Sequence, residues 1–326
     1  MAKPLLEVRG LKTYFFTDEG VVKAVDGIDF DIHKGEIFGL VGESGCGKSV
    51  TALSLLRVVQ SPPGRIVGGK AMFEGKDLMK ISEKEMRRVR GAKISMIFQD
   101  PHSSLNPVFK IGDQIAEAIQ LHQRADKKEV PSKVAKALDL VRIPDPRDRM
   151  YQYPHQFSGG MKQRAMIAMM LSCNPALLIA DEPTTAVDVT IQIQILELLK
   201  ELRGKQGASI MLITHNLGVI AEVCDRVAVM YAGNIVEQAD MASLFGDPKH
   251  PYTRALLGAF PSAEKKRGEL TVIPGFVPSL VNPPSGCKFH PRCPYAKPIC
   301  TEEMPPVAKV GEGHIVRCHL YRGGKG

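Results

Sequence analysis

Residues 42–49 read Gly-Glu-Ser-Gly-Cys-Gly-Lys-Ser, and this octapeptide fits the pattern G-x-x-x-x-G-K-[ST]. The apolar stretch Glu36–Val41 before it is predicted to be a buried strand, and Ser49–Val59 after it is apolar at helical spacing. In this setting a nest of backbone N–H groups and a helix N-terminus can hold polyphosphate oxygens. The stretch therefore predicts a phosphate-binding loop between a strand and a helix.

Each loop position has an expected role. The glycines at 42, 45 and 47 are expected to adopt positive φ and to let the backbone approach the phosphates. Lys48 is expected to reach the β- and γ-phosphates, and the loop's last residue, Ser49, to ligate Mg²⁺. The thiol of Cys46 sits within the loop, so we expect a thiol reagent to reach it and block ATP binding.

A second stretch supplies carboxylates. Ala176–Ala180 is predicted to be a buried strand that ends at Asp181 and Glu182. By itself an acidic strand end is usually structural. Together with the phosphate loop, it predicts that Asp181 holds Mg²⁺ and that Glu182 polarises the attacking water.

The rest of the chain alternates strands and helices, which predicts an α/β fold with parallel strands. Further strands are expected at Leu6–Val8, Val22–Phe30, 93–98 and Ser209–Thr214, with a hairpin at Val227–Gln238 turning on residues 232–234, and helices at Ile191–Leu202 and Leu217–Val223.

Residues 101–172 have a helical pattern and read as an insertion. Ile111, Ile115 and Ile119 lie on one helical stripe. Val134, Leu138 and Val141 lie on a second stripe. Pro144 and Pro146 then end the helical pattern.

Composition excludes some classes of protein and leaves others open. No run approaches 18 apolar residues, and the start at Met1–Pro4 predicts no signal peptide. We therefore expect a cytoplasmic chain whose membrane role, if it has one, needs partner subunits. The net charge of +8 is compatible with a solvated surface, with nucleic acid or with anionic lipid, and does not choose among them.

Four of the seven cysteines cluster in a proline-rich region after about residue 246, which reads as a small irregular domain. Their spacing is C-x₅-C-x₆-C-x₁₇-C, formed by Cys287, Cys293, Cys300 and Cys318. Clustered cysteines in a cytosolic chain favour a metal over disulfides. An iron–sulfur cluster, a zinc ion and uncomplexed thiols all remain open, although zinc ribbons prefer closer pairs.

The stretch Phe157–Gln163, Phe-Ser-Gly-Gly-Met-Lys-Gln, resembles the ABC-ATPase signature Leu-Ser-Gly-Gly-Gln. Ser158 is a good N-cap for the predicted helix Met161–Leu171, and the glycines expose the helix N-terminus to an anion. Three other family elements appear in order: Phe98–Pro101 resembles the glutamine loop, Thr185–Asp188 the D-loop and Thr214-His215 the histidine switch. Valine at 187 and asparagine at 216 depart mildly from the family pattern.

Several further stretches resemble the ATP-binding subunits of dipeptide and oligopeptide ABC transporters. They are Ser104–Pro107, Tyr153–Gln156, Met230–Gly233 and His250–Thr253. The resemblance implies a phosphate-loop NTPase with a RecA-like core, an antiparallel β subdomain and a helical insertion over residues 1–247, followed by a metal-binding domain over 248–326. In this family that extension can carry a [4Fe–4S] cluster, which the resemblance favours for the four cysteines.

The resemblance also implies site residues and partners. Glu182, Gln99 and His215 are implied in catalysis, with Gln99 also at Mg²⁺. Adenine is expected to stack on Phe15 rather than on the adjacent Tyr14, which faces the other way in a strand. The implied nucleotide contacts are Gly42, Ser44, Gly45, Cys46, Gly47, Lys48, Ser49 and Val50, and the contacts to ATP across a dimer are Ser158, Gly159, Gly160 and Asp188.

The implied function is ATP hydrolysis that drives import of short peptides. The partners would be a second, homologous ATPase, two membrane permeases and, indirectly, an extracytoplasmic peptide-binding protein, all serving a chain on the cytoplasmic face of the inner membrane. Nickel, glutathione or oligosaccharide cargo stays open, because the ATPase does not touch the cargo. A soluble ABC ATPase acting on nucleic acid or ribosomes, and a sensor built on the cysteine cluster, are the alternatives from other classes; we expect no nucleic-acid partner.

Overall fold

The computed structural model describes residues 3–98, 105–123, 125–184, 188–259 and 273–322. Contacts within the chain divide it into two compact units. The first unit comprises Met1–His33, Ile37–Met79 and Ile213–Gly326, and the second comprises Lys34–Glu36 and Lys80–Leu212. The C-terminal region thus belongs to the same unit as the N-terminal strands.

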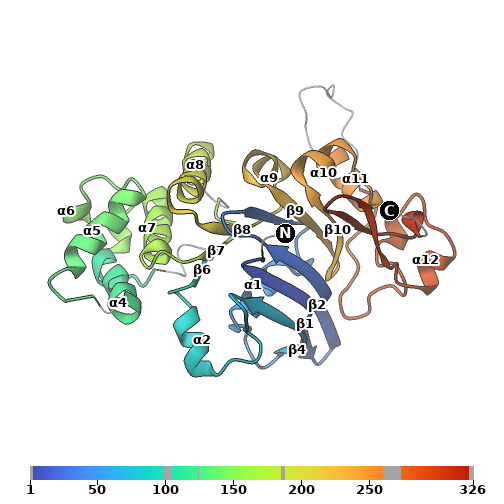
Figure 1. The fold of residues 1–326 in the computed structure, drawn as a ribbon, viewed down its shortest axis with the longest axis horizontal. Coiled ribbons are helices and arrows are strands. Elements are labelled where there is room, and N and C mark those ends of the chain that lie inside the picture. The colour runs from blue at the N-terminus through green and yellow to red at the C-terminus, as the bar shows by residue number, and fades with distance from the viewer. Residues whose placement is uncertain (1–2, 99–104, 124, 185–187, 260–272, 323–326) are drawn as a thin grey trace. The chain divides into compact units, whose positions relative to one another are not determined.

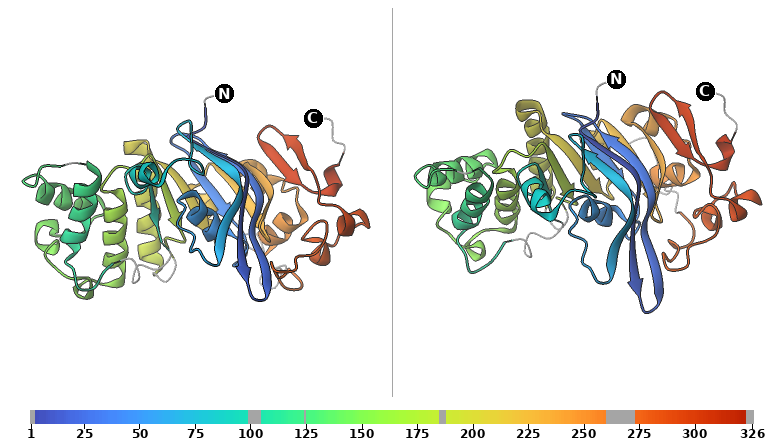
Figure 2. Two further views of the ribbon diagram at one scale, coloured as in Figure 1. Left: turned by 90° about the horizontal axis from the view of Figure 1, so that it is seen from below. Right: turned by 60° about the horizontal axis from the view of Figure 1, so that its bottom comes forward.

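The first unit contains an antiparallel sheet in the order β2-β1-β4-β5 (Figure 1). Its strands are β1 (Leu6–Thr17), β2 (Gly20–Ile32), β4 (Gly64–Phe73) and β5 (Lys76–Asp77). The long β1–β2 hairpin is clear in Figure 2 and confirms both predicted N-terminal strands. The strand β4 was not predicted, because its glycines weaken the strand signal.

Five further strands of the first unit run in the order β11-β12-β10-β9-β3. They are β3 (Ile37–Val41), β9 (Arg226–Tyr231), β10 (Asn234–Asp240), β11 (Val307–Gly311) and β12 (His314–Arg317). The strand β3 pairs with β9 in parallel. The predicted hairpin is confirmed: Ala232 and Gly233 both have positive φ, as a two-residue turn with the right twist requires.

The helices of this unit are short. They are α1 (Lys48–Leu55), α9 (Leu217–Val223), α10 (Met241–Gly246), α11 (Pro251–Gly258) and α12 (Ile299–Glu302), with 3₁₀ turns at His290–Arg292 and His319–Tyr321. The helix α1 ends before the predicted Val59, since Arg57 already adopts positive φ. The C-terminal region is less irregular than predicted, because β11 and β12 extend the sheet from β10.

The second unit joins three strands, in the order β8-β7-β6, to a group of helices. The strands are β6 (Ile94–Ile97), β7 (Leu177–Asp181) and β8 (Ser209–Thr214), and the helices are α2 (Glu83–Val89), α4 (Ile111–Gln123), α5 (Val130–Leu140), α6 (Pro146–Arg149), α7 (Gly159–Leu171) and α8 (Val189–Gln206), with a 3₁₀ turn at Pro154–Gln156. The strands β6 and β7 pair in parallel, and every residue of both is buried.

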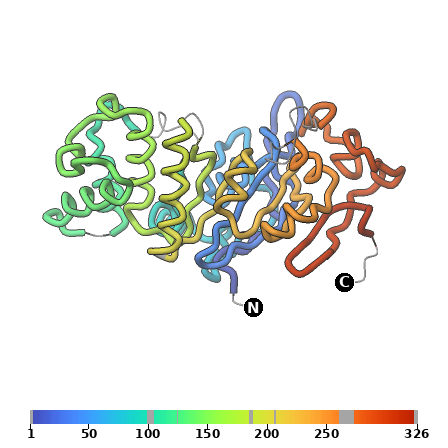
Figure 3. Tube along the Cα trace, turned by 90° about the horizontal axis from the view of Figure 1, so that it is seen from above, coloured from blue at the N-terminus to red at the C-terminus, as the bar shows by residue number. Residues whose placement is uncertain are grey.

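The helices α4, α5, α6 and α7 lie within residues 101–172, where the helical pattern is predicted (Figure 3). Ile111, Ile115 and Ile119 of α4 are at most 1% exposed, and Val134 and Leu138 of α5 are fully buried. The two stripes pack α4, α5 and α7 against one another. Among the described helices, none combines the length and apolar character needed to cross a membrane.

Candidate functional site

The phosphate loop lies between the end of β3 and the start of α1, as predicted. Lys48 is the first residue of α1, and Gly47 caps the helix in a left-handed conformation with φ 110°. The hydroxyl of Thr51 donates to the Gly47 carbonyl at 3.0 Å, and Ser54 bonds Thr13 of β1 at 2.7 Å. The loop is therefore anchored to the helix and the antiparallel sheet, and its N–H groups stand at a helix N-terminus, where an anion is stabilised.

The three loop glycines are required for different reasons. Gly45 and Gly47 have positive φ, as expected, but Gly42 does not. A Cβ on Gly42 would stand 2.1 Å from the Met230 carbonyl oxygen, and one on Gly47 would stand 2.1 Å from that of Ala24. The prediction was wrong for Gly42: close approach of a neighbouring strand, and not backbone handedness, demands glycine there.

The Lys48 ammonium already has partners in the loop. Its Nζ atom donates to the carbonyl oxygens of Gly42 at 2.7 Å and Glu43 at 3.1 Å, and the residue is only 5% exposed. The loop carbonyls thus hold the charge where a phosphate would meet it. Ser44 is exposed, and Ser49 and Val50 are half-buried on the first turn of α1.

The expected accessibility of Cys46 is wrong. The residue is completely buried, and burial raises the pKa of its thiol. Its Sγ atom lies 2.8 Å from the position that a Gly42 Cβ would take and 4.0 Å from Lys48 Nζ, so the side chain turns into the fold. A buried, protonated thiol is a poor target for reagents.

Aromatic residues on β1 differ in their surroundings. The Tyr14 hydroxyl donates to Asp26 at 2.7 Å, and burial together with this carboxylate raises the pKa of Tyr14 to about 12. Phe15 is half-buried, while Phe16 is 49% exposed with the Arg65 guanidinium 5.7 Å from its ring centre. The Tyr14 hydroxyl is thus hydrogen-bonded to Asp26, and adenine stacking on Phe15 stays a prediction.

In the second unit, β7 delivers the two carboxylates to its end. Asp181 is the last residue of the strand and is 4% exposed. Glu182 follows with φ 46°, a conformation that non-glycine residues seldom adopt. Strain of this kind clusters at functional sites, because the surrounding structure must enforce it. The backbone therefore turns sharply where the catalytic carboxylate is predicted.

The signature stretch begins α7, as predicted. Ser158 is the N-cap, and its hydroxyl accepts from the Met161 N–H at 3.3 Å. A Cβ on Gly159 would meet nothing within 4 Å, whereas one on Gly160 would stand 2.9 Å from Ile191 of α8. The first glycine leaves the helix end open to an anion, and the second permits close packing of α8.

Gln163 is a site-shaping residue that the sequence did not reveal. Its side chain is 1% exposed and its Nε2 donates to the Pro183 carbonyl at 2.6 Å. This bond ties α7 directly to the turn that follows Glu182. A glutamine inside a helical run gives no local sign of such a contact.

The remaining predicted residues lie at element ends or outside the described residues. Asp188 caps α8 and accepts from Ile191 at 2.9 Å, and His215 is exposed just after β8. Asn216, where the family pattern has aspartate, caps α9 by accepting from Gly218 and Val219, a role that either side chain can fill. Gln99 lies outside the described residues.

The four clustered cysteines line one pocket. Its walls also include His250, Phe289 and Tyr295, and none of the seven cysteines, all of them within the described ranges, is in a disulfide. The backbone N–H of Cys287 donates to the Cys300 carbonyl at 2.8 Å, which joins the first and third of these cysteines. The pocket thus brings together all four cysteines of the predicted cluster.

Each of these sulfur atoms accepts a backbone N–H. The donors are Phe289 to Cys287, Tyr295 to Cys293, Leu320 to Cys318 and Lys297 to Cys300. Such bonds favour a thiolate, yet burial raises the pKa of Cys287 to about 11 and also raises those of Cys293 and Cys318. The donor set therefore fits a group that brings positive charge into the pocket.

The arrangement does not fit a single metal ion. Within the described residues, no group of three or more histidine, cysteine or acidic side chains could hold one. A tetrahedral zinc site needs all four sulfurs about 2.3 Å from one point.

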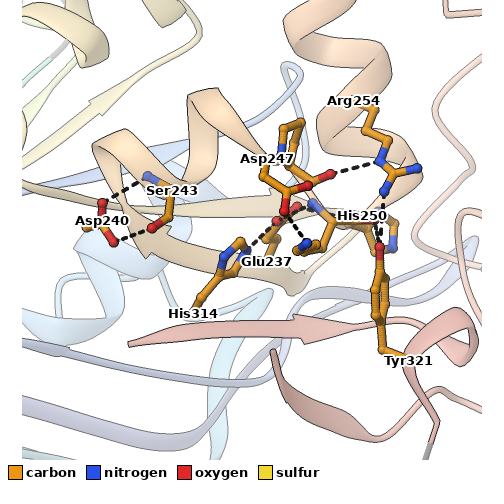
Figure 4. A network of polar contacts seen from close by, with 10 residues as sticks. Glu237, Asp240, Ser243, Asp247, His250, Arg254, His314 and Tyr321 are labelled. Atoms are coloured by element: carbon orange, nitrogen blue, oxygen red, sulfur yellow. Dashed lines mark hydrogen bonds and ion pairs between the residues drawn. The ribbon is translucent and has the colours of Figure 1, made fainter. Parts of the chain in front are cut away.

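A buried carboxylate organises the start of α11 beside this pocket (Figure 4). Glu237 of β10 accepts from the backbone N–H groups of Lys249 and His250 at 2.7 and 2.8 Å, and it bonds His314 of β12 at 2.7 Å. His250 in turn caps α11 by accepting from Tyr252 at its Nδ1 atom. Its Nε2 atom is buried and has no hydrogen-bond partner among the described residues.

Two family models match the chain. The model described as ABC transporter matches residues 25–185, and the model described as oligopeptide/dipeptide transporter, C-terminal region, matches residues 236–300. The first match contains the phosphate loop, α7 and the acidic strand end. The second begins in β10 and reaches the third cysteine of the pocket.

Curated relatives match over almost the whole length. A probable peptide ABC transporter ATP-binding protein of Sinorhizobium fredii is 54% identical over 96% of this chain and 94% of its own. The dipeptide transport ATP-binding protein DppD of Bacillus subtilis is 51% identical over 97% of this chain and 94% of its own. The oligopeptide transport ATP-binding protein OppD of the same organism is 52% identical over 97% and 88%.

Solved structures share the fold. The ATP-binding cassette MJ0796, in a dimeric post-hydrolysis state bound to ADP and Pi, has a TM-score of 0.65 at 22% identity and covers 72% of this chain and 98% of its own. The protein cbiO1 from Clostridium perfringens, part of the ABC transporter complex cbiONQ, has a TM-score of 0.65 at 26% identity over 78% and 96%.

Proposed function

The chain belongs to the ABC transporter family as one of its ATP-binding proteins, and from this premise we propose that it drives the import of dipeptides or oligopeptides. It is an ATPase with the α/β fold of an ABC cassette. The match of residues 236–300 to the oligopeptide/dipeptide transporter C-terminal region carries the cargo assignment. ATP-binding proteins named for dipeptides and oligopeptides are about half identical over nearly the full chain, which supports it.

In the proposed reaction, the phosphate loop binds ATP and the end of β7 activates water. Lys48 would exchange its bonds to the loop carbonyls for bonds to the β- and γ-phosphates, while loop N–H groups hold the remaining oxygens. Glu182 would polarise the attacking water, with Gln99 and His215 orienting it and the γ-phosphate. Phe15 would stack on the adenine.

Mg²⁺ would be held by oxygen donors of the types it prefers. Ser49 on α1, Asp181 at the end of β7 and Gln99 supply a hydroxyl, a carboxylate and an amide oxygen. The ion would neutralise charge on the β- and γ-phosphates when bound. Asp181 suits this role because a buried carboxylate gains most from a nearby cation.

The second ATP contact would come from another subunit. Ser158, Gly159, Gly160 and Asp188 lie at two helix N-termini, which favour anions, and Gly159 has open space above it. We propose that these residues of one ATPase close over ATP held by a second, homologous ATPase. Closure on ATP and opening after hydrolysis would then move two membrane permeases.

We also propose that the C-terminal domain, over about 248–326, carries a [4Fe–4S] cluster on Cys287, Cys293, Cys300 and Cys318. The backbone N–H donors directed at all four sulfurs support this assignment. Hydrogen bonds to cluster sulfurs also tune reduction potential. Brown colour after anaerobic purification is the expected result, and colourless protein with stoichiometric zinc would refute the cluster.

The proposed location is the cytoplasmic face of the inner membrane, where the chain would associate peripherally with its permeases, which would receive cargo from an extracytoplasmic peptide-binding protein. The test is reconstitution of the complex in vesicles with peptide inside or outside. We expect ATP-dependent uptake of dipeptides, stimulated by the binding protein. Uptake of nickel, glutathione or oligosaccharide in place of peptide would refute the cargo but not the motor.

Glu182→Gln tests the motor itself. The amide cannot act as a base, so we expect ATP binding to persist while turnover falls by about 100-fold or more. The closed ATPase dimer should accumulate with ATP. Normal turnover in this variant would remove Glu182 from the proposed role.

A further inference from the structure

The phosphate loop is held by two residues from the C-terminal region, and both contacts fall on Glu43. The backbone N–H of Glu43 donates to the Tyr252 hydroxyl at 3.0 Å. The carboxylate of Glu43 receives two bonds from Arg292, at 2.8 Å from Nη1 and 3.2 Å from Nη2. Glu43 occupies a variable position of the loop pattern, so phosphate binding alone does not explain its partners.

Glu43 also contacts the lysine that is predicted to bind phosphate. Its carbonyl oxygen accepts from Lys48 Nζ at 3.1 Å and from the Cys46 N–H at 3.3 Å. A single residue therefore joins Arg292 and Tyr252 on one side to Lys48 on the other. A displacement of Glu43 would move the carbonyl that orients the lysine.

Tyr252 is a rigid anchor. It is completely buried in α11, and its ring packs at 4.6 Å from that of Tyr231 and 5.4 Å from that of Phe289. Its backbone N–H bonds His250, and His250 is held in turn by Glu237 (Figure 4). The hydroxyl that meets the loop thus has almost no freedom to follow a moving partner.

Arg292 is equally constrained. It is 8% exposed, its Nε donates to the Pro274 carbonyl at 2.9 Å, and its guanidinium lies 5.9 Å from the centre of the Tyr231 ring. A planar guanidinium that grips a carboxylate with two bonds fixes direction as well as distance. Arg292 also directly precedes Cys293 of the pocket, so its backbone is set by the cysteine region.

We propose that Arg292 and Tyr252 are positioning residues for nucleotide binding, which hold Glu43 so that Lys48 and the loop backbone meet the phosphates in the correct geometry. The C-terminal region is then a structural part of the ATP site. The inference rests on the proposed ATPase role of the loop and adds a pair of determinants that lie outside the nucleotide motifs.

The test measures ATP affinity of the full-length chain with a fluorescent ATP analogue, beside melting temperature. Arg292→Met should weaken binding about 10-fold and Tyr252→Phe about 3-fold, because the first removes two charged bonds and the second one neutral bond. In steady-state assays KM for ATP should rise while kcat at saturating ATP changes less than about two-fold. Arg292→Lys should recover part of the affinity.

Arg254→Met is the matched control. Arg254 lies on the same helix as Tyr252, and its side chain bonds only the Pro248 carbonyl and the Tyr321 hydroxyl in the contacts described (Figure 4). We expect ATP affinity to stay at the wild-type value. An equal loss in Arg254→Met would overturn the proposal, because the effect would then be general loosening of the region.

A double variant supplies the decisive comparison. Glu43→Gln should weaken ATP binding about as much as Arg292→Met, and combining them should add little, because both break the same contact. Additive losses, or wild-type affinity in folded Arg292→Met and Tyr252→Phe, would overturn the proposal. If Arg292→Met does not fold, the ATP affinity of Tyr252→Phe still tests the proposal, since this variant loses only the hydroxyl that bonds Glu43. Failure of the wild-type chain to bind ATP would instead refute the proposed function.

Discussion

The phosphate loop and the cysteine pocket belong to one compact unit, yet their polar groups are satisfied in opposite ways. In the loop, the Lys48 ammonium is bonded to two carbonyl oxygens. Around the pocket, His250 Nε2 and His319 Nδ1 are buried without hydrogen-bond partners among the described residues, and burial raises the pKa of three thiols. A loop that binds and releases a substrate needs protein partners for its polar groups, whereas a pocket that holds the proposed cluster could rely on that cluster.

Among the variants that test this comparison, Lys48→Ala is expected to have the largest effect. ATP affinity should fall by about 100-fold or more, because the ammonium is the charge that meets the phosphates. The melting temperature should change by no more than about 2 °C, since the loop's glycine packing and helix bonds remain. Lys70→Ala, at an exposed lysine of β4, is the control and should change neither quantity. A large loss of stability in Lys48→Ala would show that the folded loop depends on the bonds of the lysine.

The pocket should behave in the opposite way. Cys300→Ser should abolish the visible absorbance of anaerobically purified protein and lower the melting temperature by about 5 °C or more, because the proposed cluster would contribute its binding energy to folding. Cys173→Ser, at a half-buried cysteine outside the pocket, should leave both unchanged. Unaltered stability in Cys300→Ser would contradict a structural role for the bound group.

His250, in the wall of the pocket, makes the pH dependence of stability a further test of this comparison. Burial lowers the pKa of His250 to about 3, while an unfolded histidine titrates near its usual 6.5. Below pH 6.5 the unfolded chain therefore binds the extra proton, and stability is lost as the pH falls toward 3. From the shift, the loss at pH 5 relative to pH 7 is about 2 kcal/mol in unfolding free energy.

His250→Asn should remove that dependence. Asparagine can still cap α11 by accepting from Tyr252, but it does not titrate. Urea unfolding at pH 7 and pH 5 measures the difference, and His155→Asn, at an exposed histidine, should keep the wild-type slope. A pH dependence that survives in His250→Asn would assign it to other groups.

The smallest expected effect concerns Gly45. Its φ of 78° is unfavourable for a side chain, but a Cβ there would meet nothing within 4 Å. Gly45→Ala should therefore cost only about 1 kcal/mol in unfolding free energy, from backbone strain alone. Gly204→Ala, in the open on helix α8, should instead stabilise by about 0.5–1 kcal/mol. If both variants changed the unfolding free energy in the same direction, this account of the loop would be contradicted.

Local patterns in the sequence predicted much of the site. The loop between a strand and a helix, the positive φ of Gly45 and Gly47, the cap at Ser158 and the isoleucine stripe of α4 are each confirmed, because turns, caps and amphipathic faces depend on residues a few positions apart. The glycine-rich strand β4 and the short strands β11 and β12 escaped prediction, since their pairing comes from neighbours and not from their own residues.

By itself, the sequence determined that a phosphate loop, a serine-capped helix and an acidic strand end occur in this order, because each depends on short-range chemistry. Only the tertiary structure decided that Cys46 is buried, that Gly42 faces the Met230 carbonyl and that Glu43 meets residues 209 and 249 positions away. These facts depend on which distant backbones approach the loop, and close packing of remote segments leaves no periodic or spaced signal along the chain.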